Sequence, residues 1–162
     1  MKHVLLAVIL LLAYSELKAA TRAGVYLGLA EFDDLAEDTV TLGGIVESPI
    51  GGHVFLGAQA EYWDLDYKFS DDSLRDLSVA PYAKVYVPNR SGVTPYLKGG
   101  MGLHLIKKTT NGNRDDKQDL SLDLGTGILV SLPGLALKVE YQVREFLSVE
   151  YSQFMVSTAT FF

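Results

Sequence analysis

Several charged side chains of this sequence lie between apolar residues, where folding would bury them. Burial of a charge lowers the stability of the fold unless the charge is paired. Five of these side chains alternate with Val, Leu, Ala and Tyr in segments typical of β-strands: Glu61, Lys84, Lys98, Lys138 and Glu140. A charge that leaves water must be paired, because an isolated buried charge is strongly unfavourable. These residues come from four predicted strands, so we expect them to form a salt-bridge network inside a closed sheet.

The two histidines that follow residue 20 are candidate general bases. A serine-type hydrolase needs a nucleophile and an orienting acid within hydrogen-bond reach of such a base. By strand parity His53 and His104 both face the interior, and no recognisable catalytic motif surrounds either of them. We therefore expect hydrogen-bonded interior histidines, no catalytic residues and no enzymatic activity.

Acidic pairs in the predicted loops are the candidate metal ligands: Asp33-Asp34, Asp71-Asp72 and Asp115-Asp116. Hard cations bind carboxylate oxygens, but these pairs lack the spacing of a dedicated calcium loop. Acidic runs of this kind are commonly solvated loop tips. The chain has no Cys, HExxH motif or Gly-rich phosphate loop, so we expect no metal site and no cofactor. The formal net charge of −6 argues against nucleic acid as a partner.

Strands must position these residues, because apolar and polar side chains alternate along most of the chain. Turn residues or polar stretches separate eight such segments: 23–32, 39–47, 53–63, 78–87, 93–107, 120–132, 135–144 and 151–162. The face that carries the charges, Asp123 included, is also rich in Gly, which saves volume inside a narrow barrel but weakens a solvated strand. We therefore place this face inside and the Leu- and Val-rich face outside, against lipid.

The predicted connections alternate between long and short along the chain. The long ones are 33–38, 64–76, 108–118 and 145–150, and the short ones are 48–52, 88–92 and 133–134. A barrel of the outer membrane has short periplasmic turns and longer outer loops, with aromatic girdles between them. We predict an all-β fold, an eight-stranded antiparallel up-and-down transmembrane β-barrel, with Tyr62, Trp63, Tyr67, Phe69, Tyr141 and Phe146 near its rims.

The N-terminus has the layout of a secretory signal peptide. Lys2 precedes an apolar run over 4–13, which is too short for a membrane-spanning helix of about 20 residues, and Ala13-Tyr14-Ser15 offers a small-residue cleavage site. We predict a signal peptide over 1–15, with cleavage as late as residue 20, and a single barrel domain over 16–162.

The last predicted strand ends on Phe162, and its edge needs a neighbour. Antiparallel closure against the first strand supplies one and completes the barrel. Two side-chain rows compete for the lipid-facing side: Phe162, Thr160, Thr158, Val156 and Phe154 on one face, and Phe161, Ala159 and Met155 on the other. The register of this strand stays open.

Short, individually weak motifs along nearly the whole chain resemble those of a known protein family. They are Thr94-Pro95-Tyr96-Leu97-Lys98-Gly99-Gly100-Met101-Gly102, Leu124-Gly125-Thr126-Gly127, Val139-Glu140-Tyr141 and the terminal Phe162. Together with the signal peptide and the strands, the chain resembles the small outer-membrane β-barrel proteins of Gram-negative bacteria, the OmpA/OmpX/opacity-like group. The resemblance implies a porin-like monomer of the bacterial outer membrane that contacts its lipid and lipopolysaccharide. It also implies that the barrel-assembly machinery reads Phe162, and that loops 33–38, 64–76 and 108–118 meet any surface ligand.

The function that follows is a structural or surface-interaction role, in adhesion or envelope bracing, without an open pore, because side chains just fill an eight-stranded barrel. One alternative is a lipid A-modifying enzyme of the same fold. The lipid A deacylases keep a serine two residues after the catalytic histidine, where this sequence has Ile106. The other alternative is a soluble lipocalin-like carrier, which would turn its apolar face inward.

Overall fold

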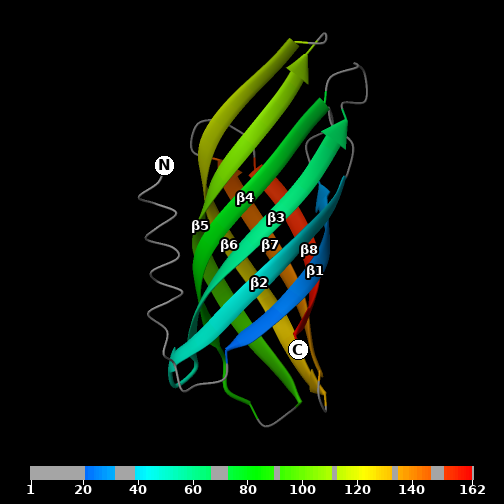
Figure 1. The fold of residues 1–162 in the computed structure, drawn as a ribbon. Helices are drawn as coiled ribbons and strands as arrows, with labels where there is room; N and C mark the ends of the chain where they lie inside the picture. Colours follow the sequence, from blue (N-terminus) through cyan, green and yellow to red (C-terminus); the bar gives the residue numbers. More distant parts are fainter. Residues whose placement is uncertain are drawn as a thin grey trace.

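The computed structural model describes residues 21–31, 39–66, 73–89, 92–110, 113–132, 135–146 and 152–161, which form a closed antiparallel barrel (Figure 1). Its strands are β1 (Arg22–Glu31), β2 (Thr39–Gly51), β3 (Val54–Asp66), β4 (Ser73–Tyr86), β5 (Val93–Thr110), β6 (Asn113–Leu132), β7 (Leu135–Phe146) and β8 (Ser152–Phe161). Each strand pairs with the next one in sequence, and β8 pairs with β1. The predicted all-β, antiparallel, up-and-down order is confirmed. These ranges contain no helix that is long and apolar enough to cross a membrane.

The outer surface of the barrel is apolar, and its interior is polar. Successive residues of a strand point to opposite sides of the sheet, so the alternation in the sequence becomes two faces. On β1, Val25, Leu27 and Leu29 are 57–58% exposed, whereas Lys84 and Glu61 are 0% and 1% exposed inside the barrel. A soluble carrier would show the reverse arrangement.

The β5–β6 hairpin is longer than the sequence predicts. Residues 108–118 were expected to form a loop, but β5 continues to Thr110 and β6 begins at Asn113, which leaves only 111–112 as the connection. Charged residues on both faces of this hairpin erase the apolar alternation, while backbone pairing continues, as between Lys107 and Asp116. Figure 1 shows β5 and β6 reaching beyond their neighbours.

The predicted loop 64–76 is also too long, because the outward positions Asp66 and Arg75 are charged there, while the apolar residues Leu65 and Leu74 point inward. Strand β3 runs to Asp66 and β4 begins at Ser73, so the connection is 67–72. The predicted alternation of long and short connections is therefore wrong in detail, because 111–112 is shorter than the opposite connection 87–92. At the end of the barrel where β3 connects to β4 and β5 connects to β6, residues that were predicted to form loops instead lengthen the paired strands.

His53 lies in the tight turn between β2 and β3, and its predicted interior position is wrong. Gly52 in this turn has φ +53°, a left-handed conformation that favours glycine. His53 is exposed because β3 begins one residue later, at Val54. Its backbone carbonyl accepts a hydrogen bond of 2.9 Å from the Tyr86 amide.

The backbone register of β8 places two threonines opposite lipid-facing residues. Thr158 pairs with Leu27 and Thr160 pairs with Val25 on β1. These are members of the first of the two rows considered for this strand. Phe162, loop 33–38 and the predicted signal peptide with its cleavage site lie outside the described residues and stay predictions.

Two apolar clusters inside the barrel enclose a polar section. One consists of Tyr26, Ile45, Tyr86, Tyr96 and Leu129, and the other of Trp63, Leu65, Leu74, Ile106 and Phe146. Trp63 and Phe146, predicted for the lipid interface, are instead 0% and 3% exposed because they share the inward parity of Glu61 and Arg144. Tyr62, at 45%, does face outward, as does Tyr141 at 36%. Tyr67 and Phe69 lie outside the described residues.

Candidate functional site

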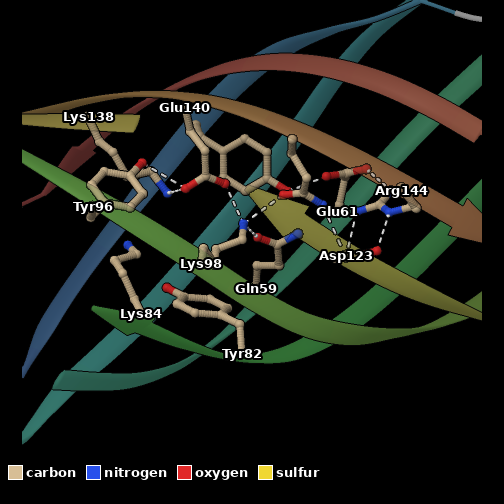
Figure 2. Close-up of polar contacts among 12 residues, drawn as sticks. Gln59, Glu61, Tyr82, Lys84, Tyr96, Lys98, Asp123, Lys138, Glu140 and Arg144 are labelled. Atoms are coloured by element: carbon tan, nitrogen blue, oxygen red, sulfur yellow. Dashed lines mark hydrogen bonds and ion pairs between the residues drawn. The ribbon is translucent and has the colours of Figure 1, made fainter. Parts of the chain in front are cut away.

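The middle of the barrel interior is organised around Glu140 of β7. Its carboxylate pairs with Lys98 of β5 and with Lys138, whose Nζ lies 3.1 Å from Oε2. The hydroxyl of Tyr96 donates a third interaction, a hydrogen bond of 2.7 Å. Figure 2 shows these groups, from β5 and β7, converging in the interior of the barrel. Three of the five predicted network residues therefore meet at one carboxylate.

Lys98 is fully satisfied despite its burial. An ammonium group has three hydrogen-bond donors, and Nζ has three acceptors: Glu140, Gln59 Oε1 at 2.8 Å and Gln142 Oε1 at 2.6 Å. The cation also lies 5.0 Å from the centre of the Tyr82 ring, within cation–π range. Water is not needed to solvate this charge.

Lys84 forms its ion pair with a residue that the sequence did not single out, Glu47 of β2. The Lys84 Nζ lies 2.5 Å from Glu47 Oε2, and both side chains are fully buried. The hydroxyls of Tyr82 and Tyr86 donate to the same carboxylate at 3.1 and 3.0 Å. Strand parity puts Glu47 on the inner face, but parity alone does not say which cation it meets.

Glu61 pairs with Arg144, a second residue absent from the predicted set. Arg144 Nη1 donates to Glu61 Oε1 at 2.8 Å, and its Nε donates to Asp123 Oδ1 at 3.0 Å. Tyr26 adds a hydrogen bond of 2.6 Å to Glu61. One guanidinium thus joins carboxylates from β3 and β6 across the barrel, as Figure 2 shows.

A fourth polar group lies next to this one and contains His104. Its Nδ1 lies 2.5 Å from Asp76 Oδ2, and its Nε2 lies 2.9 Å from Ser121 Oγ. All three side chains are 0% exposed. His104 is therefore an interior, hydrogen-bonded histidine, as expected. Its partners could not be recognised from the sequence, because Asp76 and Ser121 come from other strands, β4 and β6.

The described residues contain no group of three or more His, Cys, Asp or Glu side chains that could hold a metal ion. Asp116 instead accepts from Arg114 Nε at 3.1 Å on the exposed hairpin. Asp33-Asp34 and Asp71-Asp72 lie outside the described ranges.

A closed antiparallel barrel with an apolar outer surface and a charged, hydrogen-bonded interior is the architecture of a membrane-spanning β-barrel. The profile of the outer membrane protein beta-barrel domain matches residues 4–161, and the chain belongs to this family. It is a protein of the bacterial outer membrane, as the resemblance implied. No curated protein matches it in sequence.

Several solved structures share the fold at low sequence identity. Neisserial surface protein A superimposes with a TM-score of 0.67 at 14% identity, covering 87% of this chain and 94% of its own. Ail, the attachment invasion locus protein of Yersinia pestis, gives 0.56 at 14% identity, with 89% and 97% covered. The outer membrane enzyme PagL gives 0.61 at 13% identity, with 85% and 97% covered. At this identity the likeness concerns the fold alone.

Proposed function

We propose that the chain spans the outer membrane as a monomeric eight-stranded barrel with a structural and surface-interacting role, and that it forms no open pore. The observation that carries this proposal is the filled interior. Paired charges occupy its middle, and apolar clusters lie on both sides of them. A continuous water path would have to displace buried ion pairs, which is costly.

No large, stable conductance is expected when the purified protein is inserted into a planar lipid bilayer. Side chains just fill a barrel of this size, and here oppositely charged side chains pair with one another. The measurement is a single-channel recording, with a larger porin as a positive control for insertion. Stable conductance steps of porin size would contradict the closed interior.

The residues exposed at the end of the barrel that carries the long β5–β6 hairpin support a surface role; we call this end the outer end. The β5–β6 hairpin exposes Lys107, Arg114 and Asp116 beyond the apolar belt, and polar groups held on paired strands suit contact with polar surfaces. We propose that this hairpin, with connections 32–38 and 67–72, meets lipopolysaccharide and any external ligand, and that nucleic acid is not a partner. Binding of purified protein to immobilised matrix components and lipopolysaccharide tests this role, and loss of binding after shortening the hairpin would localise it.

Deleting Phe162 is expected to impair insertion in vivo more than it lowers the stability of the folded barrel. In the family that this chain resembles, the assembly machinery reads the terminal aromatic residue, so its loss acts on recognition. The measurements are the folded fraction in outer membranes, from heat-modifiable migration on a gel, and refolding into detergent as the control. Equal assembly with and without Phe162 would place the signal elsewhere.

Modification of lipid A remains the second candidate. The hydrogen-bonded set of Ser121, His104 and Asp76 favours it, because these are the residue types of a serine hydrolase. The set faces the interior of the barrel, whereas the acyl chains of lipid A lie against its outer surface. Incubating the protein with lipid A and recording the product mass tests this candidate, and an unchanged mass would exclude it.

A further inference from the structure

A row of four charged side chains crosses the outer surface of the sheet at the outer end of the barrel, on strands β3 to β6. In register, Asp64 pairs with Arg75, Arg75 with Lys107, and Lys107 with Asp116. Successive residues of a strand alternate between the two faces of a sheet, so Arg75 shares the outward parity of the lipid-facing Leu77. The row therefore lies on the outer surface and not in the barrel interior.

This charged row lies at the depth of the lipid headgroups. The next row toward the middle of the membrane contains Tyr62, Leu77 and Leu105, and the first two are 45% and 49% exposed. A tyrosine on the outer surface of a barrel favours the membrane–water interface, because its ring is apolar and its hydroxyl is polar. The Tyr62 hydroxyl lies 3.5 Å from Asp64 Oδ2, so the charged row begins where the apolar surface ends.

Two cations of the row, Arg75 and Lys107, are direct neighbours across the β4–β5 ladder. Like charges at directly opposed positions destabilise a sheet. Asp64 offsets one of the two charges, since its Oδ2 lies 2.9 Å from Arg75 Nε, whereas Asp116 accepts from Arg114. Among the residues that the structure describes, none forms an ion pair with the Lys107 ammonium. The pair of cations therefore has a positive charge that an external anion would offset.

A phosphate group has the charge and the geometry for this position. A phosphomonoester carries about −1.5 to −2 charges at pH 7 and three strong acceptor oxygens. A guanidinium group binds two phosphate oxygens at once, and an ammonium group binds phosphate as a point charge. Arg75 is 60% exposed and Lys107 is exposed. Opposed residues of antiparallel strands have Cβ atoms about 4.5–5.5 Å apart, so both cations can contact one phosphate.

We propose that Arg75 and Lys107 bind a phosphomonoester of lipid A, the phosphorylated glycolipid of the outer leaflet. The phosphate lies between the two cations, and the acyl chains lie against the apolar surface that begins at Tyr62 and Leu77. This inference rests on the proposed function, because it needs the hairpin end to face outward, and it names the group of the lipid that the surface recognises. Every contact is on the outer surface, so the filled interior is left intact.

The test is a titration of the full barrel, folded in nonionic detergent, with bisphosphorylated lipid A. Native mass spectrometry measures the fraction of barrels that retain lipid and gives an apparent Kd. Arg75→Gln combined with Lys107→Gln should raise this Kd by roughly 30-fold, because each cation near a membrane surface contributes about fivefold. Dephosphorylated lipid A should bind the unmodified barrel as weakly as bisphosphorylated lipid A binds this double variant.

The matched control is Lys108→Gln combined with Lys117→Gln. Both lysines are exposed at the same end of the barrel, and their loss changes the net charge equally, but they have the opposite strand parity. We expect this control to bind lipid A as the unmodified barrel does. Free inorganic phosphate should not displace the lipid, because it lacks acyl chains that bury apolar surface. Heat-modifiable migration on a gel establishes that each variant is folded.

Three results would overturn the proposal: equal Kd values for the unmodified barrel and the Arg75/Lys107 variant, an equal loss in the Lys108/Lys117 control, or no preference for phosphorylated lipid A. Displacement by inorganic phosphate would also overturn it, since the site would then recognise free phosphate. Binding to matrix components is recorded separately on the same protein. Its absence would count against the proposed surface role alone.

Discussion

Replacing Arg144 with Met is expected to lower the free energy of unfolding by about 3–5 kcal/mol, because the change leaves two buried carboxylates without their cation. Arg144 is 1% exposed and joins Glu61 to Asp123 across the barrel. Met keeps much of the volume, so the lost charge dominates the effect. Urea unfolding in detergent, followed by tryptophan fluorescence or heat-modifiable migration, measures it.

Arg75→Met is the matched control. Arg75 also pairs with an aspartate, Asp64, at 2.9 Å, but their side chains are 60% and 40% exposed. Solvent-exposed pairs contribute about 0–1 kcal/mol. Adding Glu61→Gln and Asp123→Asn to Arg144→Met should recover part of the loss, because the stranded charges are then removed. Equal stability of the two single variants would mean that the interior network contributes little.

Replacing Gly127 with Ala is expected to cost about 1–3 kcal/mol, the usual penalty of overpacking. An added Cβ would overlap the Val139 carbonyl oxygen, and it would lie 2.5 Å from the Tyr96 hydroxyl. Backbone cannot yield as a flexible side chain does, and a displaced Tyr96 would lose its hydrogen bond to Glu140. The same urea titration measures this loss.

Gly99→Ala is the control for that substitution, since it adds the same methyl group to a neighbouring strand. Its nearest atom would be Leu124 Cδ2 at 3.7 Å, an ordinary contact. A surface change of this kind should stay within about 0.5 kcal/mol. If both glycine variants were equally stable, the interior at Gly127 would be looser than the described contacts indicate.

The alternation of apolar and polar residues predicted the strands, because each strand has one face toward lipid and one toward the interior. It failed where both faces meet water, as at Lys107 and Asp116, since no apolar pattern remains there. It also misplaced Trp63 and Phe146, because an aromatic residue at a strand end suits either the lipid interface or an apolar interior cluster.

The inward direction of Lys84 and Lys98 follows from parity, but their partners do not. Which carboxylate meets which cation depends on the register and on the curvature of the closed sheet. The same limit hid the set around His104, since its partners are not neighbours in the sequence. The signal that could have found it is the inward parity of Asp76 and Ser121, combined with a strand register.

Three ion pairs of the interior join strands that are not neighbours: Glu47 of β2 meets Lys84 of β4, Lys98 of β5 meets Glu140 of β7, and Glu61 of β3 meets Arg144 of β7. A partly formed, open sheet would therefore hold several charges without counter-ions. Such an intermediate is unfavourable in lipid, so closure and charge neutralisation must happen together. Folding of this barrel is consequently expected to be a single cooperative event. The chain enters the membrane core only as the strands close and the interior ion pairs form.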